Sequence, residues 1–99
     1  MAITQFTRWS GGKPEEMLAA AKKAKTFWVK HGAERCLLNR FHTGSWTGQW
    51  LFVARFPDWA ALGKAQTELS KDPEYQKLIT QVLSMAKLEG RNVLDSYDL

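Results

Sequence analysis

Hydrophobic and polar positions along this chain alternate with two different periods, and each change of period marks a new element. Residues 2–9 alternate with a period of two, which is typical of a β-strand, and two glycines follow this run. Residues 14–31 follow the helical period, with Pro14 in the first turn and Gly32 after the last. The predicted buried stripe of this helix comprises Met17, Ala21, Ala24 and Trp28.

The middle of the chain carries two β-rich runs, residues 35–43 and 50–56. The loop between them, residues 44–48, has a glycine at each end, which predicts an antiparallel hairpin. The second run is apolar at alternate positions on both faces, apart from Arg55. Because a sheet face in water is polar at alternate positions, we expect both faces to be covered. Helices of this chain would cover one face and a second subunit the other.

Two aspartates mark the starts of two further helices. Asp58 precedes a helical stripe that ends near Leu69, and Asp72 precedes a proline and a stripe that ends near Met85. Gly90 then punctuates the chain, and residues 91–97 alternate as a last strand. The order β-α-β-β-α-α-β predicts one α+β domain over residues 1–99, with a four-stranded antiparallel sheet and its helices on one face.

Composition adds an aromatic excess to this picture. The chain is 44% hydrophobic and 24% charged, which is ordinary for a globular protein, yet it carries five tryptophans and five phenylalanines. Such an excess indicates a pocket or a subunit interface in addition to a core. The net charge of +4 comes from scattered lysines with one cluster at residues 22–25, which we interpret as a solvated helix face and not as a nucleic-acid or membrane surface.

Cysteine and histidine are too few for a disulfide or a metal site. Cys36 is the only cysteine, and two distant histidines do not complete a set of metal ligands with it. No apolar run reaches the roughly eighteen residues of a membrane span, and the N-terminus lacks the apolar core of a signal peptide. The sequence therefore predicts a cytoplasmic protein without metal or membrane partner.

Three segments at element boundaries resemble a known superfamily. They are residues 11–16 (GGKPEE), 56–61 (FPDWAA) and 72–76 (DPEYQ). With the order of elements, they are similar to the dimeric α/β-barrel superfamily, which includes antibiotic-biosynthesis-type monooxygenases, muconolactone isomerases and stress-responsive proteins without an assigned role. The resemblance covers nearly the whole chain. It implies a ferredoxin-like half-barrel whose sheet pairs with that of a second copy, and a pocket between sheet and helices in each protomer.

The haem-degrading branch of this superfamily provides a test of cofactor use. It places a histidine, a tryptophan and an asparagine at positions that correspond here to Leu78, Phe56 and Gln5. Since the axial histidine is missing, the resemblance predicts no haem. The cofactor-independent quinol oxidases of the superfamily need no such histidine, and we expect no cofactor.

His42 is the first candidate for chemistry. Together with Arg40 it would share one face of the second strand with Cys36 and Leu38. There an imidazole can act as a general base while a guanidinium stabilises an oxyanion. The alternative is that His42 lies in water at the end of the strand beside the hairpin.

Aromatic residues form the second candidate group. The rings of Trp9, Trp50, Phe52 and Phe56 can line a pocket for a flat ligand, with Gln5, Asn39 or Arg55 as orienting polar groups. Filling of the core or barrel explains the same rings equally well. Trp46, at the tip of the hairpin loop, has no intramolecular role that the pattern predicts, which favours an interface or a pocket mouth.

Two hypotheses for function follow. In the first, a homodimer binds a small, mostly apolar molecule and oxygenates or isomerises it without a cofactor, with Gln5, Asn39, His42 and Arg55 orienting or deprotonating it. In the second, the homodimer is a non-catalytic structural or stress-related module. RNA binding is not expected, because Arg55 stands where the aromatic strand of an RNA-recognition motif requires a ring.

Overall fold

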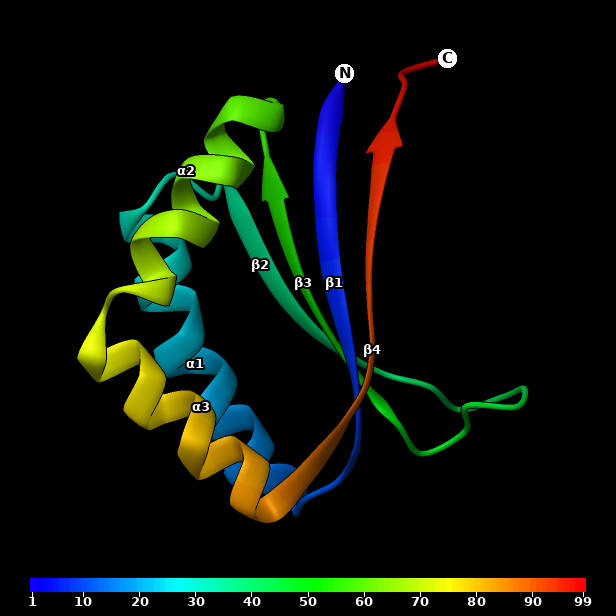
Figure 1. Ribbon diagram of the computed structural model, residues 1–99. Coiled ribbons are helices and arrows are strands. Elements are labelled where there is room, and N and C mark those ends of the chain that lie inside the picture. Colours follow the sequence, from blue (N-terminus) through cyan, green and yellow to red (C-terminus); the bar gives the residue numbers. More distant parts are fainter.

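The computed structural model describes all 99 residues and confirms the predicted order of elements. These are β1 (Ala2–Gly11), α1 (Pro14–Lys30), β2 (Arg35–Arg40), β3 (Trp50–Phe56), α2 (Trp59–Ser70), α3 (Pro73–Met85) and β4 (Ala86–Ser96). All neighbouring strands are antiparallel in the order β2-β3-β1-β4, and the three helices cover one face of the sheet (Figure 1).

The register of the strands defines two faces. On the face that the helices cover, called the inner face, Gln5, Thr7 and Trp9 of β1 alternate with residues of the opposite face. The other face, called the outer face, carries Leu37, Asn39, Leu51, Val53, Arg55, Thr4, Phe6, Arg8, Asn92 and Leu94. The predicted alternation of β1 and the two apolar faces of β3 are thereby confirmed.

The hairpin loop is longer than predicted. Strand β2 ends at Arg40 and not at residue 43, because the chain closes a loop over residues 41–49. The Gly48 amide donates to the Phe41 carbonyl at 2.7 Å and the Phe41 amide donates to the Gln49 carbonyl at 2.9 Å. These bonds replace the strand pairing that would have carried β2 on to His42. Figure 1 shows the loop extending beyond the sheet, on the side away from the helices.

The last strand begins earlier than predicted. It starts at Ala86, directly after α3, and Gly90 lies within it instead of marking its beginning. Arg8 pairs with Gly90 and Trp9 with Leu88, so Glu89 is an extra residue that forms a bulge. A Cβ at Gly90 would lie 3.5 Å from the Arg8 guanidinium, which is an ordinary van der Waals contact.

Side-chain caps and a tight turn place the helices. An oxygen of Asp58 accepts a hydrogen bond from the Ala61 amide at 2.8 Å, and Asp72 caps α3 in the same way, as the sequence predicted. In the turn from β1 to α1, Gly12 has a φ of +79°, and a Cβ there would lie 2.6 Å from the Met17 sulfur. Glycine therefore lets α1 lie close to the end of β1.

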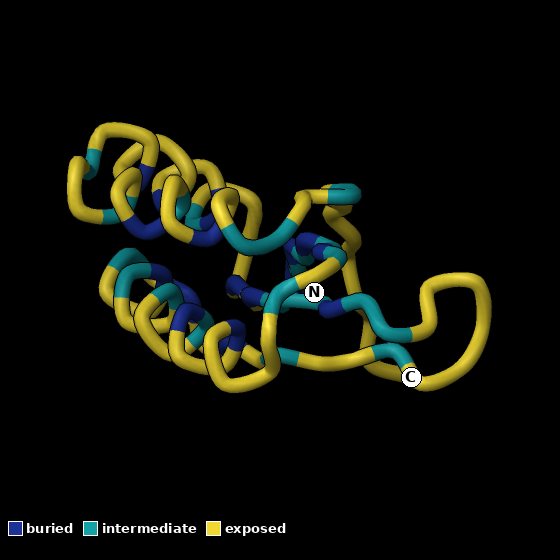
Figure 2. The backbone as a smooth tube through the Cα atoms, turned by 90° about the horizontal axis from the view of Figure 1, so that it is seen from below, coloured by how far each residue is buried: buried dark blue, intermediate teal, exposed yellow.

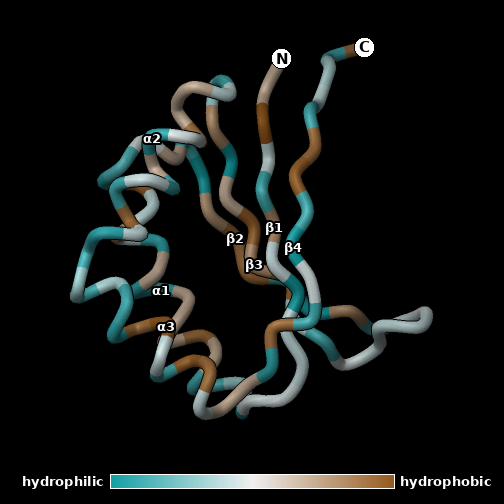
Figure 3. The backbone as a smooth tube through the Cα atoms, in the orientation of Figure 1, coloured by the Kyte–Doolittle hydropathy of each residue, from teal (hydrophilic) through white to brown (hydrophobic).

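Two clusters form the core between sheet and helices. One surrounds Phe56 and includes Ile3, Trp28 and Leu69, and the other joins Trp9 and Trp50 to helix residues such as Met17, Leu78 and Val82. Buried positions face the space between the two layers, whereas the hairpin loop and the end of β4 are exposed (Figure 2). The hydropathy of the chain follows the same division, with apolar segments in the middle of the sheet and on the inner sides of the helices (Figure 3). None of the helices combines the length and apolar character that a membrane-crossing segment requires.

Candidate functional site

A cavity of about 520 Å³ lies between the inner face of the sheet and the helices. Its volume falls within the range of roughly 300–1,000 Å³ that is typical of small-molecule sites. Sixteen of its 22 lining residues are hydrophobic, so the cavity favours an apolar occupant. Residues of both core clusters contribute to its lining, such as Trp28 of the first and Trp9 of the second.

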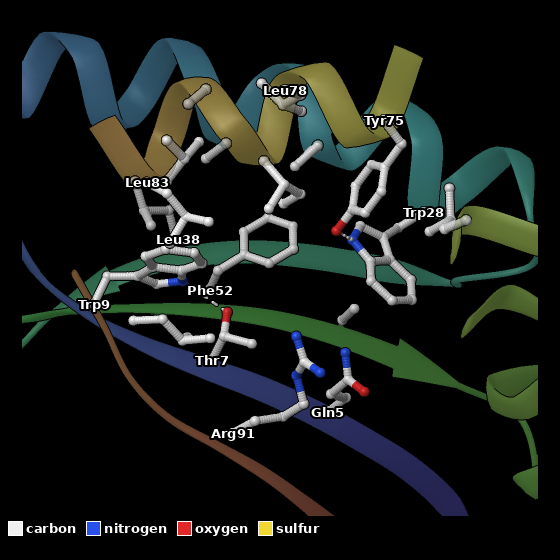
Figure 4. A pocket seen from close by; sticks show the side chains of 18 of the residues that line it. Gln5, Thr7, Trp9, Trp28, Leu38, Phe52, Tyr75, Leu78, Leu83 and Arg91 are labelled. Carbon is white, nitrogen blue, oxygen red and sulfur yellow. Dashed lines mark hydrogen bonds between the residues drawn. The ribbon is translucent and has the colours of Figure 1, made fainter. Parts of the chain in front are cut away.

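Aromatic rings supply the walls. Trp9 from β1 and Phe52 from β3 rise from the sheet, and Trp28 of α1 and Tyr75 of α3 meet them from the helices (Figure 4). The Trp9 indole nitrogen donates a hydrogen bond to the Thr7 hydroxyl at 2.8 Å. Because both partners stand on the inner face of β1, this bond fixes the orientation of the Trp9 ring.

Tyr75 provides a neutral hydroxyl inside the cavity. The Trp28 indole nitrogen donates to its oxygen at 3.1 Å, which leaves the Tyr75 proton available to another acceptor. Burial raises the pKa of the Tyr75 hydroxyl above its ordinary value, while the hydrogen bond from Trp28 and the charge of Arg91 act in the opposite direction. The raised pKa keeps this phenol protonated near neutral pH, so Tyr75 acts as a donor and not as a base.

Arg91 is the only charged residue in the lining. It stands on β4 opposite Thr7, and Figure 4 shows its guanidinium beside the amide of Gln5. Gln5 is 5% exposed, and its side-chain oxygen accepts a hydrogen bond from Gln66 at 2.6 Å. That bond leaves the Gln5 amide nitrogen as a donor. Arg91 forms no ion pair within the chain, so its charge is available to a ligand. A free guanidinium and an amide donor therefore lie together at one side of a mostly apolar cavity.

The lining contains neither a carboxylate nor a histidine. The cavity can therefore stabilise negative charge on a ligand, but its side chains offer no general base of ordinary strength. Nor does the chain hold a group of three or more histidine, cysteine, aspartate or glutamate side chains that could bind a metal ion.

Of the residues predicted to form a site, the structure brings Gln5, Trp9 and Phe52 together in the cavity lining. Trp50 and Phe56 lie on the same face but pack inside the two core clusters and do not line the cavity. For these two rings, the alternative of core filling describes their position.

The other predicted residues lie elsewhere. Asn39 and Arg55 are exposed on the outer face, on the far side of the sheet from the cavity. His42 is exposed in the hairpin loop, because β2 ends two residues before it, and it does not share a strand face with Cys36. Cys36 is buried, and burial raises the pKa of its thiol to about 11 against the charge of Lys25.

Trp46 lies at the outer-face end of the hairpin and is 45% exposed. The Arg8 guanidinium stacks on it at 4.2 Å from the ring centroid, and the Phe41 ring meets it edge to face at 5.4 Å. Arg8 also donates to the Gln49 side chain at 2.6 Å. Two contacts thus hold the exposed Trp46 ring at the rim of the outer face, and the hydrogen bond to Gln49 fixes the Arg8 side chain that supplies one of them. Trp46 does not line the cavity.

Sequence reasoning missed the polar groups that distinguish the cavity. Arg91 is the only cation of the predicted last strand, and it shares a strand face with the apolar Val93. A lone cation on an apolar face is a sequence signal that could have indicated a binding group. Tyr75 lies in segment 72–76 at the start of the helix that ends near Met85, and its hydroxyl at a predicted helical position is a second such signal. The pairing of Gln66 with Gln5 depends on the approach of α2 to β1, for which the sequence offers no local signal.

Solved structures share this fold over nearly the whole chain. A cofactor-independent oxygenase from Streptomyces nogalater, SnoaB, is 17% identical and superposes with a TM-score of 0.76 over 99% of this chain and 95% of its own. A NIPSNAP family protein from Agrobacterium tumefaciens is 12% identical, with a TM-score of 0.72 over 98% of this chain and 87% of its own. A dimeric ferredoxin-like protein from an uncultured marine organism is 20% identical, with a TM-score of 0.64 over 98% of both chains.

No protein-family model and no curated protein matches the sequence. At these identities the structural comparisons show the fold alone, which is the ferredoxin-like fold of dimeric α/β-barrel proteins.

Proposed function

We propose that this protein is a homodimer whose cavity binds a flat, mostly apolar molecule with one acidic oxygen, and that it oxygenates this molecule without a cofactor. The observation that carries the proposal is the cavity itself, in which aromatic walls surround a single unpaired cation, Arg91. Isomerisation through the same anion is the related activity that the cavity would also support.

The class of ligand follows from the polar groups. An acidic oxygen on the ligand can accept hydrogen bonds from Arg91 and from the Gln5 amide while its ring system lies between Phe52, Trp9 and Tyr75. A dianion would leave one charge without a partner in an apolar space, which is costly. Phenols, naphthols and aromatic acids with one ionisable group fit these requirements.

The absence of a base in the lining selects among these substrates. A substrate that ionises readily near neutral pH needs only stabilisation of its anion, which Arg91 supplies. Such an anion is electron-rich and can reduce dioxygen directly. In the balanced reaction, the ring CH para to the phenol oxygen becomes a carbonyl, one atom of dioxygen enters the substrate, and the other leaves as water with that hydrogen and the phenolic proton.

The fold is compatible with this activity. SnoaB shares the fold and is described as a cofactor-independent oxygenase, so a half-barrel of this kind is compatible with such chemistry. A non-catalytic structural module would be favoured by an inner space packed solid with rings, and the cavity of about 520 Å³ argues against it.

The outer face supports the homodimer. Phe6, Leu51, Val53 and Leu94 make its centre apolar, and Leu94 is 42% exposed. An open apolar sheet face marks a protein interface more often than a surface that remains in water. The marine protein of similar fold is described as dimeric. We expect sedimentation of this chain to give twice its mass of 11.3 kDa.

Filling the cavity tests the proposal. We expect phenols and naphthols that ionise near neutral pH to increase the thermal stability of the protein and to be oxidised with uptake of dioxygen above the spontaneous rate. Ala24 lines the cavity, so Ala24→Phe should abolish both effects, whereas Ala19→Phe, an exposed position of the same helix, should preserve them. Unchanged ligand binding in Ala24→Phe would exclude this cavity as the site.

The candidate base outside the cavity has its own test. Since His42 is exposed in the hairpin loop and Arg91 lines the cavity, we expect His42→Ala to leave the oxidation rate unchanged and Arg91→Gln to reduce it. Binding without any uptake of dioxygen would reduce the function to that of a binding protein.

A further inference from the structure

Three polar side chains line the cavity where α2 meets α3. Gln66 and Ser70 lie one helical turn apart on α2, and Gln76 lies in the first turn of α3. All three residues are exposed, so they stand where the cavity opens to solvent. Because Arg91 and Gln5 hold the acidic oxygen of the proposed ligand, these three side chains are left for a second polar group.

Hydrogen bonds within the chain occupy the donors of two of these side chains. The Ser70 hydroxyl donates to the Thr67 carbonyl at 2.7 Å, and the Gln76 amide nitrogen donates to the Leu69 carbonyl at 3.0 Å. A carbonyl oxygen only accepts, so these bonds turn the hydroxyl proton and the amide nitrogen toward the backbone. The side-chain oxygens of Ser70 and Gln76 accept no hydrogen bond from the chain and remain as acceptors.

The bonded amides of Gln5 and Gln66 add a third acceptor. The Gln66 nitrogen donates to the Gln5 oxygen at 2.6 Å, which leaves the Gln66 oxygen free to accept and the Gln5 nitrogen free to donate. An exchange of roles between the two amides leaves one free oxygen and one free nitrogen as well. A free donor and a free acceptor therefore lie on neighbouring side chains of the lining.

We propose that the ligand carries a hydroxyl group in addition to its acidic oxygen, and that this hydroxyl donates to the acceptor oxygens of Gln66, Ser70 and Gln76. An ammonium group is disfavoured there, because the lining holds one cation, Arg91, and no carboxylate. An ether oxygen would remove water from the acceptors without replacing its hydrogen bonds. The inference rests on the cavity of the proposed function and narrows its ligands to hydroxylated aromatic acids and aromatic diols that ionise once.

A matched set of naphthoates tests the hydroxyl contact on the wild-type protein. The set comprises naphthoate, the isomers that carry one hydroxyl on the ring without the carboxylate, and the methyl ethers of these isomers. We expect calorimetry to show that at least one hydroxyl isomer binds about three- to tenfold more tightly than naphthoate. Its methyl ether keeps the oxygen but has no donor, so it should lose this gain.

Removal of the acceptors tests the residues themselves. A triple variant carries Gln66→Met, Ser70→Ala and Gln76→Met, which replace the acceptors with apolar groups of similar size. We expect it to reduce the gain from the hydroxyl to less than about twofold and to leave the affinity for naphthoate within about threefold of wild type, since Arg91 and Gln5 remain. Gln81→Met, exposed on α3 outside the lining, should preserve the gain.

The outcomes separate the hydroxyl contact from the proposed function. Naphthoate binding without a gain for any hydroxyl isomer, or a gain that survives in the methyl ether or in the triple variant, would refute the hydroxyl contact while the cavity stands as the site. Failure of naphthoate and of every isomer to bind would refute the proposed function, and the hydroxyl contact with it. The comparison of each isomer with its methyl ether needs no variant, so it decides even where the triple variant does not fold.

Discussion

Replacement of Arg91 by glutamine tests the proposed recognition of an acidic ligand. Arg91 is the one cation of the cavity lining and has no ion-pair partner, so its contribution appears in ligand binding. A hydrogen bond to a charged group contributes about 1.5–3 kcal/mol, and exposure of Arg91 to solvent places its share at the lower end. A loss of about 1.5–2 kcal/mol corresponds to a dissociation constant raised by about 10- to 30-fold.

Calorimetric titration with naphthoate and with its uncharged analogue naphthamide measures this loss. Arg91→Gln should weaken the binding of naphthoate by the stated factor and change the binding of naphthamide by less than about threefold, since only the first carries the charge that Arg91 contacts. Lys87→Gln, on the same strand but outside the cavity lining, should change neither. Equal effects of Arg91→Gln on both ligands would refute charge recognition. A loss of naphthoate binding in Lys87→Gln as large as that in Arg91→Gln would show that the overall positive charge of the protein, and not Arg91 itself, attracts the ligand.

Three further substitutions test other parts of the account. Trp46→Ala should weaken the dimer by about tenfold or more in sedimentation, because buried tryptophans dominate interface energies. Trp59→Ala, at the exposed first residue of α2, should not weaken it, and equal effects of the two substitutions would remove Trp46 from the interface. The thiol of Cys36 has a pKa raised by burial to about 11, so its contribution to stability is full below the unfolded pKa of 9.0 and is lost as pH rises toward 11. Urea unfolding should therefore show a loss on the order of 2 kcal/mol in this window that Cys36→Ala lacks, and identical alkaline profiles would contradict the assignment. Asp72→Ala should cost about 1 kcal/mol of unfolding free energy and Asp72→Asn less, since an amide oxygen can still cap α3; a neutral alanine variant would show that the cap adds nothing.

The fold could be predicted from the sequence because its signals are local and agree with one another. The alternation of β1, the capping aspartates Asp58 and Asp72, and the glycine turn before α1 each specify a structure within a few residues. The two errors arose where a bond between distant residues decides the outcome. The bulge opposite Arg8 carries β4 through Gly90, and the closing bonds of the hairpin loop end β2 before His42.

The site could be predicted only in part for a related reason. Strand periodicity places Gln5, Trp9 and Phe52 on the face that the helices cover, and these three residues line the cavity. Periodicity does not say where the helices leave space, so it cannot separate a ring that lines a cavity from one that fills the core, as Trp50 does. The position of Arg91 beside Gln5 depends on the pairing of the first and last strands, which no local pattern specifies.

The tryptophan indoles allow the most direct test of the central claim that an acidic aromatic ligand binds between sheet and helices. Trp9 and Trp28 line the cavity, whereas Trp46 and Trp59 are exposed outside it. A nitrogen-15 correlation spectrum during titration with naphthoate resolves the indole N–H signals, which single Trp→Phe variants assign. The account predicts saturable shifts of the Trp9 and Trp28 signals with those of Trp46 and Trp59 unchanged. Saturable shifts confined to Trp46 or Trp59, or no saturable shift of any indole, would contradict it.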